Sequence, residues 1–427
     1  MACPPRSSAT LDPTRVVSTN PKEIDRVVVF RREIPIGHLE RTPHGASFEY
    51  NAAVLEAGDS ELAVASTMPI RREPYAVRGV NLHPFFAGLL PEGLRHTALV
   101  KSVKTSADDL FSLLLGAGQE TVGDVWVAEP IATSRPMEVN LESGEELDFA
   151  ELLDLALGIE ETLDSKSIPG VQPKVSDAMI SLGVRGSTKM RDSILKLAPP
   201  SDPQLVENEA FCMQLARTAR LEVAPTRVLH DVAGRSALLV ERFDRNPQTP
   251  YRPPLRERAA GFRHQEDACQ LLDVYPADKY RLSMREIADA LEVCWSPLYE
   301  RLRLLQLYAF SYAIANGDLH GKNISVLWSE RRVALSPAYD LVTTLPYGDD
   351  SMALKVEGRD KRVKRADLVA FGERVGVRAK ATETMLDKLV AKLGPALGTF
   401  GAIGLDDKRT AHLEQVVKER LAHLARD

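Results

Sequence analysis

Between residues 304 and 340, a short polar run stands between an apolar helix pattern and an apolar hairpin pattern, and this stretch restricts the fold more than any other. The upstream residues recur at helical spacing and stop before Gly317, a residue type well suited to end a helix. They are Leu304, Tyr308, Ser311, Tyr312 and Ala315. The downstream residues alternate around a turn at 329–331, which predicts a β-hairpin. They are Ile324, Val326, Trp328, Val333 and Leu335.

Three polar residues are brought together by this arrangement. Asp318 and Asn323 lie at one mouth of the hairpin, and Asp340 follows its other end. Phosphoryl transfer from ATP needs this order: a carboxylate that accepts a proton from the attacking hydroxyl, an Asn that holds Mg²⁺, and an Asp that bridges Mg²⁺ to the phosphates. A single loop Asp is more often a turn former or a helix cap, so the prediction depends on the ordered set.

A lysine inside an apolar strand pattern supplies a further part of an ATP site. Lys196 lies in this pattern, where an ammonium group without a partner would be costly to bury. The helix that follows offers Glu209 as the preferred partner, and Glu207 or solvation of both charges are the alternatives. An edge lysine that extends to water also fits the pattern.

Two further segments fit weaker parts of the same scheme. Residues 167–174 contain one glycine and one lysine in a loop upstream of Lys196, which makes a weak phosphate cradle by itself. Residues 237–245 form an apolar strand pattern just before a Pro-rich segment. In a bilobal kinase this is the position of the hinge that binds adenine through backbone groups, and an ordinary edge strand is equally consistent with the pattern.

The overall charge excludes one class of protein. The chain has 427 residues, with 54 Lys+Arg against 60 Asp+Glu, and a net charge of −6 argues against a dedicated nucleic-acid binder while leaving a local basic patch open. Cys3, Cys212, Cys269 and Cys294 show neither zinc-site nor disulfide spacing, which predicts reduced thiols. Because no apolar run reaches the ~18 residues of a membrane helix and no secretory signal is visible, we expect a cytoplasmic protein.

The patterns divide the chain into a mobile tail without periodicity, an α+β unit, a strand-rich unit, and a mainly helical region that follows a Pro-rich connector. In order, these regions are residues 1–24, 25–131, 132–245 and 246–427. Within the second region, strands are expected from Arg26, at Ala63 and at Asp124, and helices within residues 83–93 and 107–115.

Taken together, these segments resemble the HipA family, bacterial serine/threonine kinases that act as toxins in type II toxin–antitoxin systems. The resemblance runs from about residue 26 to the C-terminus and implies a bilobal, protein kinase-like α+β fold with an N-terminal α+β subdomain and a mainly helical C-terminal lobe. The matching segments are residues 86–93, 170–174, 194–197, 208–212, 240–245, 265–270, 317–323 and 335–340.

The resemblance implies ATP and Mg²⁺ at one site. Asp318 would be the catalytic base, Lys196 the lysine that holds the phosphates, and Asn323 and Asp340 the metal ligands. The residues expected to contact ATP are Pro169, Gly170, Val171, Gln172, Pro173, Lys174, Lys196, Glu241, Arg242, Phe243, His320, Gly321, Lys322, Asn323, Tyr339 and Asp340.

A serine in the phosphate loop is autophosphorylated in this family, which ejects the loop and silences the kinase, and Ser167 matches it. About −2 of added charge beside the ATP phosphates would repel the loop from the site. Ser165 is an alternative position for this modification. Pro173 stands where an acidic residue is common in the family, and it stiffens the loop.

Members of the family bind a small helix-turn-helix antitoxin, HipB-like, and the complex sits on operator DNA. Residues 355–365 carry six basic and two acidic residues at the position of a DNA contact in the family. Such a cluster would add salt-dependent phosphate binding, and a solvated helix start is the alternative interpretation. The candidate DNA contacts are Arg359, Lys361, Arg362, Lys364 and Arg365.

The prediction is therefore a kinase that phosphorylates a serine of a cytoplasmic protein, without membrane association. The resemblance suggests an aminoacyl-tRNA synthetase as the target and growth arrest as the consequence. One alternative is a small-molecule kinase, because residues 317–320 also resemble the catalytic loop of aminoglycoside and choline phosphotransferases. The other is a catalytically silent co-repressor that binds only antitoxin and DNA.

Overall fold

The computed structural model describes residues 20–32, 34–79, 81–118, 121–128, 147–157, 178–184, 191–202, 204–245, 261–329 and 332–426. Several predicted features lie outside these ranges. They are the tail up to residue 19, the phosphate loop from Pro169 to Lys174, the two candidate modification sites Ser165 and Ser167, and residues 246–260 of the Pro-rich connector.

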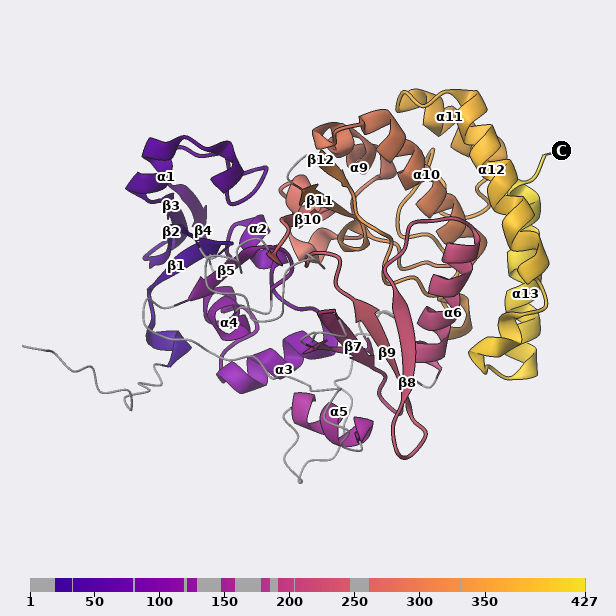
Figure 1. Ribbon diagram of the computed structural model, residues 1–427, viewed down its shortest axis with the longest axis horizontal. Coiled ribbons are helices and arrows are strands. Elements are labelled where there is room, and N and C mark those ends of the chain that lie inside the picture. Colours follow the sequence, from indigo (N-terminus) through magenta and orange to yellow (C-terminus); the bar gives the residue numbers. More distant parts are fainter. Residues whose placement is uncertain are drawn as a thin grey trace, which may run out of the picture.

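The N-terminal unit is built on a five-stranded antiparallel sheet in the order β4-β3-β2-β1-β5 (Figure 1). Alternation along β1 buries Val27 and Val29 on one face, the pattern of a half-buried strand. The strands are β1 (Arg26–Arg31), β2 (Ile34–Thr42), β3 (Gly45–Tyr50), β4 (Tyr75–Arg78) and β5 (Val125–Ala128). The helices are α1 (Ala52–Ala57), α2 (Pro84–Gly88), α3 (Gly93–Val103) and α4 (Leu110–Ala117).

Two details of this unit differ from the prediction. The tail without regular structure was expected to extend to residue 24, but Pro21–Glu23 already forms a 3₁₀ helix. The strand expected at Ala63 is wrong: this segment forms only an isolated bridge between Ala65 and Met68. Its apolar residues are buried, but the backbone N–H of Val64 donates to the hydroxyl of Tyr50 at 2.8 Å instead of to a neighbouring strand.

The second unit is an antiparallel sheet of four strands in the order β6-β7-β9-β8, with α6 packed on it (Figure 1). β9 lies inside the sheet, so the interpretation of residues 237–245 as an edge strand is wrong. The strands are β6 (Ile180–Val184), β7 (Ser193–Leu197), β8 (Thr226–His230) and β9 (Ser236–Glu241). The helices are α5 (Phe149–Leu157) and α6 (Leu205–Thr218).

The C-terminal lobe is mainly helical and contains the predicted hairpin. β11 (Ser325–Ser329) and β12 (Arg332–Leu335) pair antiparallel, as expected. A third strand, β10 (Gln265–Asp267), pairs with the other edge of β11 and was not predicted, because three residues are too few to show a period. The helices are α8 (Ala268–Leu271), α9 (Met284–Ala290), α10 (Pro297–Ala313), α11 (Arg365–Arg374), α12 (Ala379–Leu393) and α13 (Asp407–Leu424).

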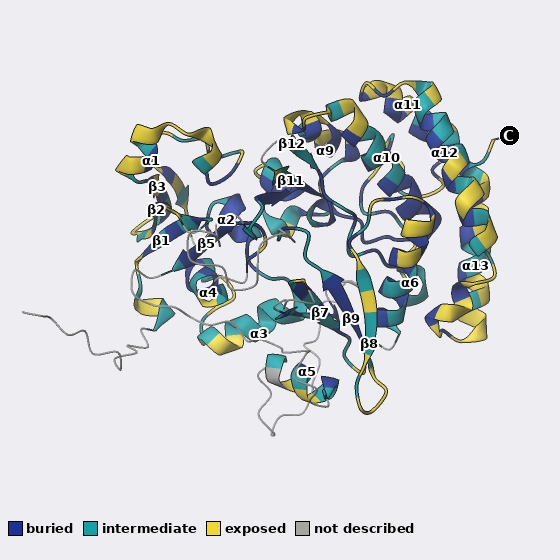
Figure 2. Ribbon diagram, in the orientation of Figure 1, coloured by how far each residue is buried: buried dark blue, intermediate teal, exposed yellow. Residues whose placement is uncertain are grey.

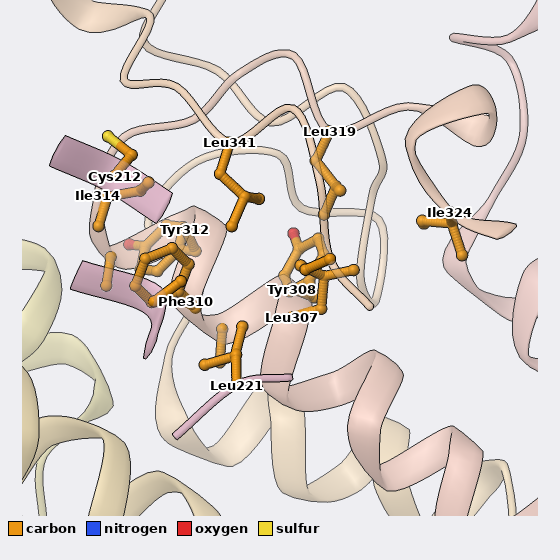
Figure 3. Close-up of a cluster of buried hydrophobic side chains, with 14 of the residues drawn as sticks. Cys212, Leu221, Leu307, Tyr308, Phe310, Tyr312, Ile314, Leu319, Ile324 and Leu341 are labelled. Carbon is orange, nitrogen blue, oxygen red and sulfur yellow. The ribbon is translucent and has the colours of Figure 1, made fainter. Parts of the chain in front are cut away.

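α10 is the central element of this lobe. Figure 2 shows exposed outer faces on α11, α12 and α13, whereas α10 contributes fully buried aromatic side chains such as Tyr308, Phe310 and Tyr312. Leu319, Ile324 and Leu341, on the segments that follow α10, belong to the same buried cluster (Figure 3). The polar loop at 316–323 is therefore anchored by its own apolar residues.

The end of α10 differs in detail from the prediction. Ala315, not Gly317, adopts the left-handed conformation, with a φ of 57°. The backbone N–H of Asn316 then donates to the carbonyl of Ser311 at 2.9 Å, a bond typical of helix ends with a left-handed residue. Gly317 is needed for a different reason, since a Cβ there would lie 2.4 Å from the carbonyl oxygen of Ser351.

Among the described residues, no helix is long and apolar enough to cross a membrane.

A buried ionic network joins the N-terminal unit to the C-terminal lobe. The carboxylate of Asp124 accepts from Arg31 at 3.3 Å and from the ring of His264 at 2.7 Å. The second ring nitrogen of His264 lies 2.9 Å from Glu266, which also accepts from the backbone N–H of Ser66 at 2.8 Å. Because both ring nitrogens face carboxylates, the protonated imidazole fits this place. Burial and Arg31 act to lower the pKa of His264, and the carboxylate of Asp124 outweighs them and raises it.

Candidate active site

Lys196 is held between two carboxylates. Its ammonium nitrogen on β7 lies 2.7 and 2.8 Å from the two oxygens of Glu209 on α6 and 2.8 Å from Asp340. Glu209 is fully buried, so the prediction that Glu209 rather than Glu207 pairs with the lysine is confirmed. Burial alone would lower the pKa of Lys196, but Asp340 and Glu209 raise it above its ordinary value, so the side chain is a fixed positive charge.

Asp340 joins the lysine to the loop after α10. One of its carboxylate oxygens accepts from Lys196, and the other accepts from the side-chain amide of Asn323 at 3.0 Å. The backbone of Asp340 is left-handed, with a φ of 58°, a conformation that Asp tolerates better than most residues. The two contacts offset the cost of this conformation and aim the carboxylate at Lys196 and Asn323.

Asp318 lies five positions before Asn323 on the same loop. Its carboxylate accepts a hydrogen bond from the hydroxyl of Tyr280 at 2.7 Å, and its backbone N–H donates to the side chain of Asn316 at 3.0 Å. The backbone N–H of His320 in turn donates to the side-chain oxygen of Asn323 at 3.2 Å. The loop is thus fixed at both ends by its own side chains, and Asp318 is almost fully buried.

The aromatic residues expected to contact ATP lie side by side. The rings of Phe243, just after β9, and Tyr339 have centroids 5.4 Å apart. The hydroxyl of Tyr339 donates to the carbonyl of Lys322 at 2.5 Å and lies 2.7 Å from the hydroxyl of Ser325. Burial raises the pKa of Tyr339 well above its ordinary value, so this hydroxyl stays protonated as a donor. Glu241, at the end of β9, forms an ion pair with Arg191 at 3.2 Å.

The side chains of two other predicted ATP contacts are used elsewhere. The guanidinium of Arg242 bonds the carboxylate of Asp244 at 2.6 Å and the carbonyl of Thr121 at 2.9 Å. The ammonium of Lys322 bonds Asp267 at 2.7 Å and the carbonyl of Gly88 at 3.0 Å. Both side chains are largely buried, where a charge needs a partner, so they hold the N-terminal unit to the rest of the chain. The predicted contacts of these two residues with ATP stay predictions.

Much of the charge in the basic cluster is balanced by acidic neighbours. Arg359 lies 3.4 Å from Asp367, and Lys361 pairs with Asp350. Arg365 pairs with Asp387 at 2.8 Å and is only 16% exposed. The guanidinium of Arg365 also donates to two backbone carbonyls and ties α11 to its neighbours, and its predicted role as a DNA contact stays a prediction. Arg362, in a left-handed turn, and Lys364, at the start of α11, complete the candidate set.

The residues present fit a magnesium ion bound together with a nucleotide. Asp340 offers a carboxylate and Asn323 an amide oxygen, which here accepts from the backbone N–H of His320 and keeps a second lone pair. Mg²⁺ usually takes one or two carboxylates and completes its shell with phosphate and water. No group of three or more His, Cys, Asp or Glu side chains that could hold a metal occurs among the described residues. Asp340 and Asn323 would leave most of the coordination shell of Mg²⁺ to phosphate and water.

Two functional contacts were missed by the sequence reasoning. Tyr280 donates to Asp318, and Asp267 pairs with Lys322. Tyr280 lies in an irregular segment and Asp267 ends the three-residue strand β10, so neither shows an apolar period. The residues that they contact are 38 and 55 positions away in the sequence. The match of residues 265–270 to the family was the only signal near them.

Comparison with known proteins agrees with this geometry. The chain matches the HipA N-terminal domain family over residues 27–128 and the HipA-like C-terminal domain family over residues 166–397. The protein Y4mE of Sinorhizobium fredii is 30% identical over 416 residues, which cover 91% of this chain and 93% of Y4mE. The serine/threonine-protein kinase toxin HipA of Shewanella oneidensis is 27% identical over 342 residues, 73% of this chain and 76% of that protein.

A solved structure shares the fold. The Shewanella oneidensis HipA in a complex with HipB and operator DNA superposes with a TM-score of 0.70 at 20% identity, covering 93% of this chain and 96% of that one. The fold and the site together define a kinase-like α+β protein with an added N-terminal unit. The chain belongs to the HipA family.

Proposed function

We propose that the protein is a serine/threonine kinase toxin that transfers the γ-phosphate of ATP to a serine of a cytoplasmic protein and thereby arrests growth. The observation that carries the proposal is the joined set of Lys196, Glu209, Asp340 and Asn323 beside the loop of Asp318. A fixed lysine, a metal-binding pair and a loop carboxylate are the parts that phosphoryl transfer requires. An aminoacyl-tRNA synthetase is our first candidate for the target protein.

Each residue has a defined role in the proposed reaction. Asp318 accepts the proton of the serine hydroxyl as its oxygen bonds to the γ-phosphorus, and the bond from that phosphorus to the bridging oxygen of ADP breaks. Lys196 holds the phosphates at the position that Glu209 fixes for it. Mg²⁺, held by Asp340 and Asn323, would neutralise charge on the phosphates. Phe243 and Tyr339 would pack against the nucleotide.

Two further properties belong to the same proposal. We propose Ser167, with Ser165 as the alternative, as an autophosphorylation site that silences the kinase. We also propose a HipB-like antitoxin as the partner, because the Shewanella relative is solved with HipB and operator DNA. Arg359, Lys361, Arg362 and Lys364 are the exposed residues among the candidate DNA contacts, and they could reach such DNA.

The function is tested by incubating the purified protein with labelled ATP and cell lysate, followed by phosphosite mapping. We expect label on one dominant protein band and on Ser167 of the enzyme itself. Label confined to small molecules would replace the protein-kinase proposal by a small-molecule kinase. No transfer at all from folded protein would leave only the co-repressor.

Binding of nucleotide and metal gives a second, independent prediction. Mg²⁺ and ATP together, at about 100 times the dissociation constant, are expected to stabilise the folded protein by about 2.7 kcal/mol. The increase in the melting temperature should require both components, because the protein supplies few metal ligands of its own. In Asp340→Asn the dependence on Mg²⁺ should disappear, whereas Asp289→Asn, at an exposed position on α9, should behave as the wild type. Equal stabilisation of Asp340→Asn would contradict the assigned metal role.

A further inference from the structure

The segment at Lys279 and Tyr280 contacts the loop of Asp318 at several points. The hydroxyl of Tyr280 donates to the carboxylate of Asp318 at 2.7 Å. The carbonyl oxygen of Lys279 accepts from the backbone N–H of Gly321 at 3.1 Å. The ring of Tyr280 lies edge-on to the ring of His320, with centroids 4.9 Å apart. One dipeptide thus contacts the loop at Asp318, His320 and Gly321.

The loop is closely packed at Gly321, where it meets this segment. A Cβ on Gly321 would lie 2.6 Å from the side chain of Leu282 and 2.9 Å from the sulfur of Cys269, so the loop is pressed against its neighbours. The ammonium of Lys279 also lies over the ring of Tyr280, at 5.3 Å from its centroid. The ring of Tyr280 is therefore held by contacts with Lys279 and His320 while its hydroxyl donates to Asp318.

The outer end of the segment is attached to the N-terminal unit. The ammonium of Lys279 lies 3.1 Å from a carboxylate oxygen of Glu92, and the lysine side chain is only 7% exposed. Glu92 occupies the N-cap of α3, yet its side chain makes no capping hydrogen bond there. The carboxylate is used across the boundary between the two units instead of within its own helix.

We propose that Tyr280 is a positioning residue for the base Asp318, and that Glu92 of the N-terminal unit anchors it through Lys279. The inference rests on the proposed kinase function and extends it, because it makes the N-terminal unit part of the machinery that orders the catalytic loop. The tyrosine acts through Asp318, which it holds in one orientation by a hydrogen bond to a charged group.

The test is a kinetic comparison of the full-length protein with Tyr280→Phe, which removes one hydroxyl and keeps the ring. The kcat for protein phosphorylation is expected to fall at least about tenfold, the scale of a hydrogen bond to a charged group. The KM for ATP should stay within a factor of about two, because the substitution is expected to leave the binding of ATP in the ground state unchanged. A residue that only supports the fold would lower the melting temperature and would not change kcat selectively.

The anchor is tested by Glu92→Gln, which removes the charge and keeps the shape. Glu92 is 31% exposed, so the variant should fold, and kcat should fall by about two- to fivefold with an unchanged KM for ATP. Matched controls are Tyr299→Phe, at a tyrosine whose residue is 59% exposed, and Glu56→Gln, on the exposed side of α1; both should retain wild-type kcat.

The outcomes separate this inference from the proposed function. If the wild type transfers phosphate and Tyr280→Phe has an unchanged kcat, the positioning role is wrong and the kinase function stands. If Glu92→Gln has the kcat of the wild type, the anchor is wrong. If the folded wild type transfers no phosphate, the proposed function itself fails. A loss of ATP affinity in Tyr280→Phe equal to its loss of kcat/KM would also overturn the positioning role.

Discussion

Asp318→Asn is expected to lower the rate of phosphoryl transfer by about 10²- to 10⁴-fold, the range that a general base contributes. The amide has nearly the shape of the carboxylate but cannot take the proton of the attacking serine. Tyr280 can still donate to its side-chain oxygen, so the loop should keep its conformation. The rate is measured with labelled ATP, and growth arrest on expression should disappear together with the phosphorylation.

The control for this variant is Asp289→Asn, the same change on the exposed face of α9. It should leave both the rate and the growth arrest unchanged. Denaturant unfolding of Asp318→Asn should give a free energy close to that of the wild type, which shows that the loss is chemical. Full transfer by folded Asp318→Asn would mean that another group takes the proton, and the mechanism proposed here would be wrong.

The largest effect on stability is expected from Asp124→Asn. Asp124 is buried and accepts from His264 at 2.7 Å, Arg32 at 3.1 Å and Arg31 at 3.3 Å. Removing its charge leaves these cationic partners without compensation, which typically costs about 3–5 kcal/mol. Denaturant unfolding near pH 6 measures the loss. The control Asp25→Asn changes an aspartate that is 78% exposed and should stay within about 0.5 kcal/mol of the wild type.

The same network makes the stability of the wild type depend on pH from both sides. The pKa of Asp124 is lowered in the folded state, so its contribution is present above its unfolded pKa of about 4 and is lost as the pH falls below that value. The pKa of His264 is raised, so its contribution is complete below its unfolded pKa of about 6.5 and is lost as the pH rises through the folded value. The network therefore stabilises most between about pH 4 and 6.5. The difference in the free energy of unfolding between Asp124→Asn and the wild type should therefore shrink above about pH 6.5. A difference that did not shrink would contradict the role assigned to the protonated His264.

Local patterns predicted α10, the hairpin and the pairing of Lys196 with Glu209. In the two strands and in the helix, apolar residues recur with a regular period because one face of each element packs against the core. A buried ammonium needs a carboxylate nearby, which restricts the possible partners of Lys196. The segment at Ala63 was mispredicted because it is apolar and buried but satisfies its backbone with side chains such as Tyr50. A short apolar run does not by itself show which partners its backbone N–H and C=O groups find for their hydrogen bonds.

The side chains of Arg242, Lys322 and Arg365 have partners that the sequence did not indicate. Each contacts a group distant in sequence, such as Asp267 for Lys322. These partners are set by tertiary packing, which no local pattern contains. Tyr280 was missed for the same reason. The phosphate loop and Ser167 lie outside the described residues, so their predicted roles stay predictions.

The arrangement around Lys196 also determines the charge that an incoming nucleotide meets. One ammonium is shared by Glu209 and Asp340, so these three side chains carry an excess of one negative charge when both carboxylates are ionised. Burial raises the pKa of Glu209 to about 7, so this excess grows as the pH rises through that value. Under the proposed function, the excess would disfavour free ATP, which is strongly anionic, relative to ATP that arrives with a divalent cation.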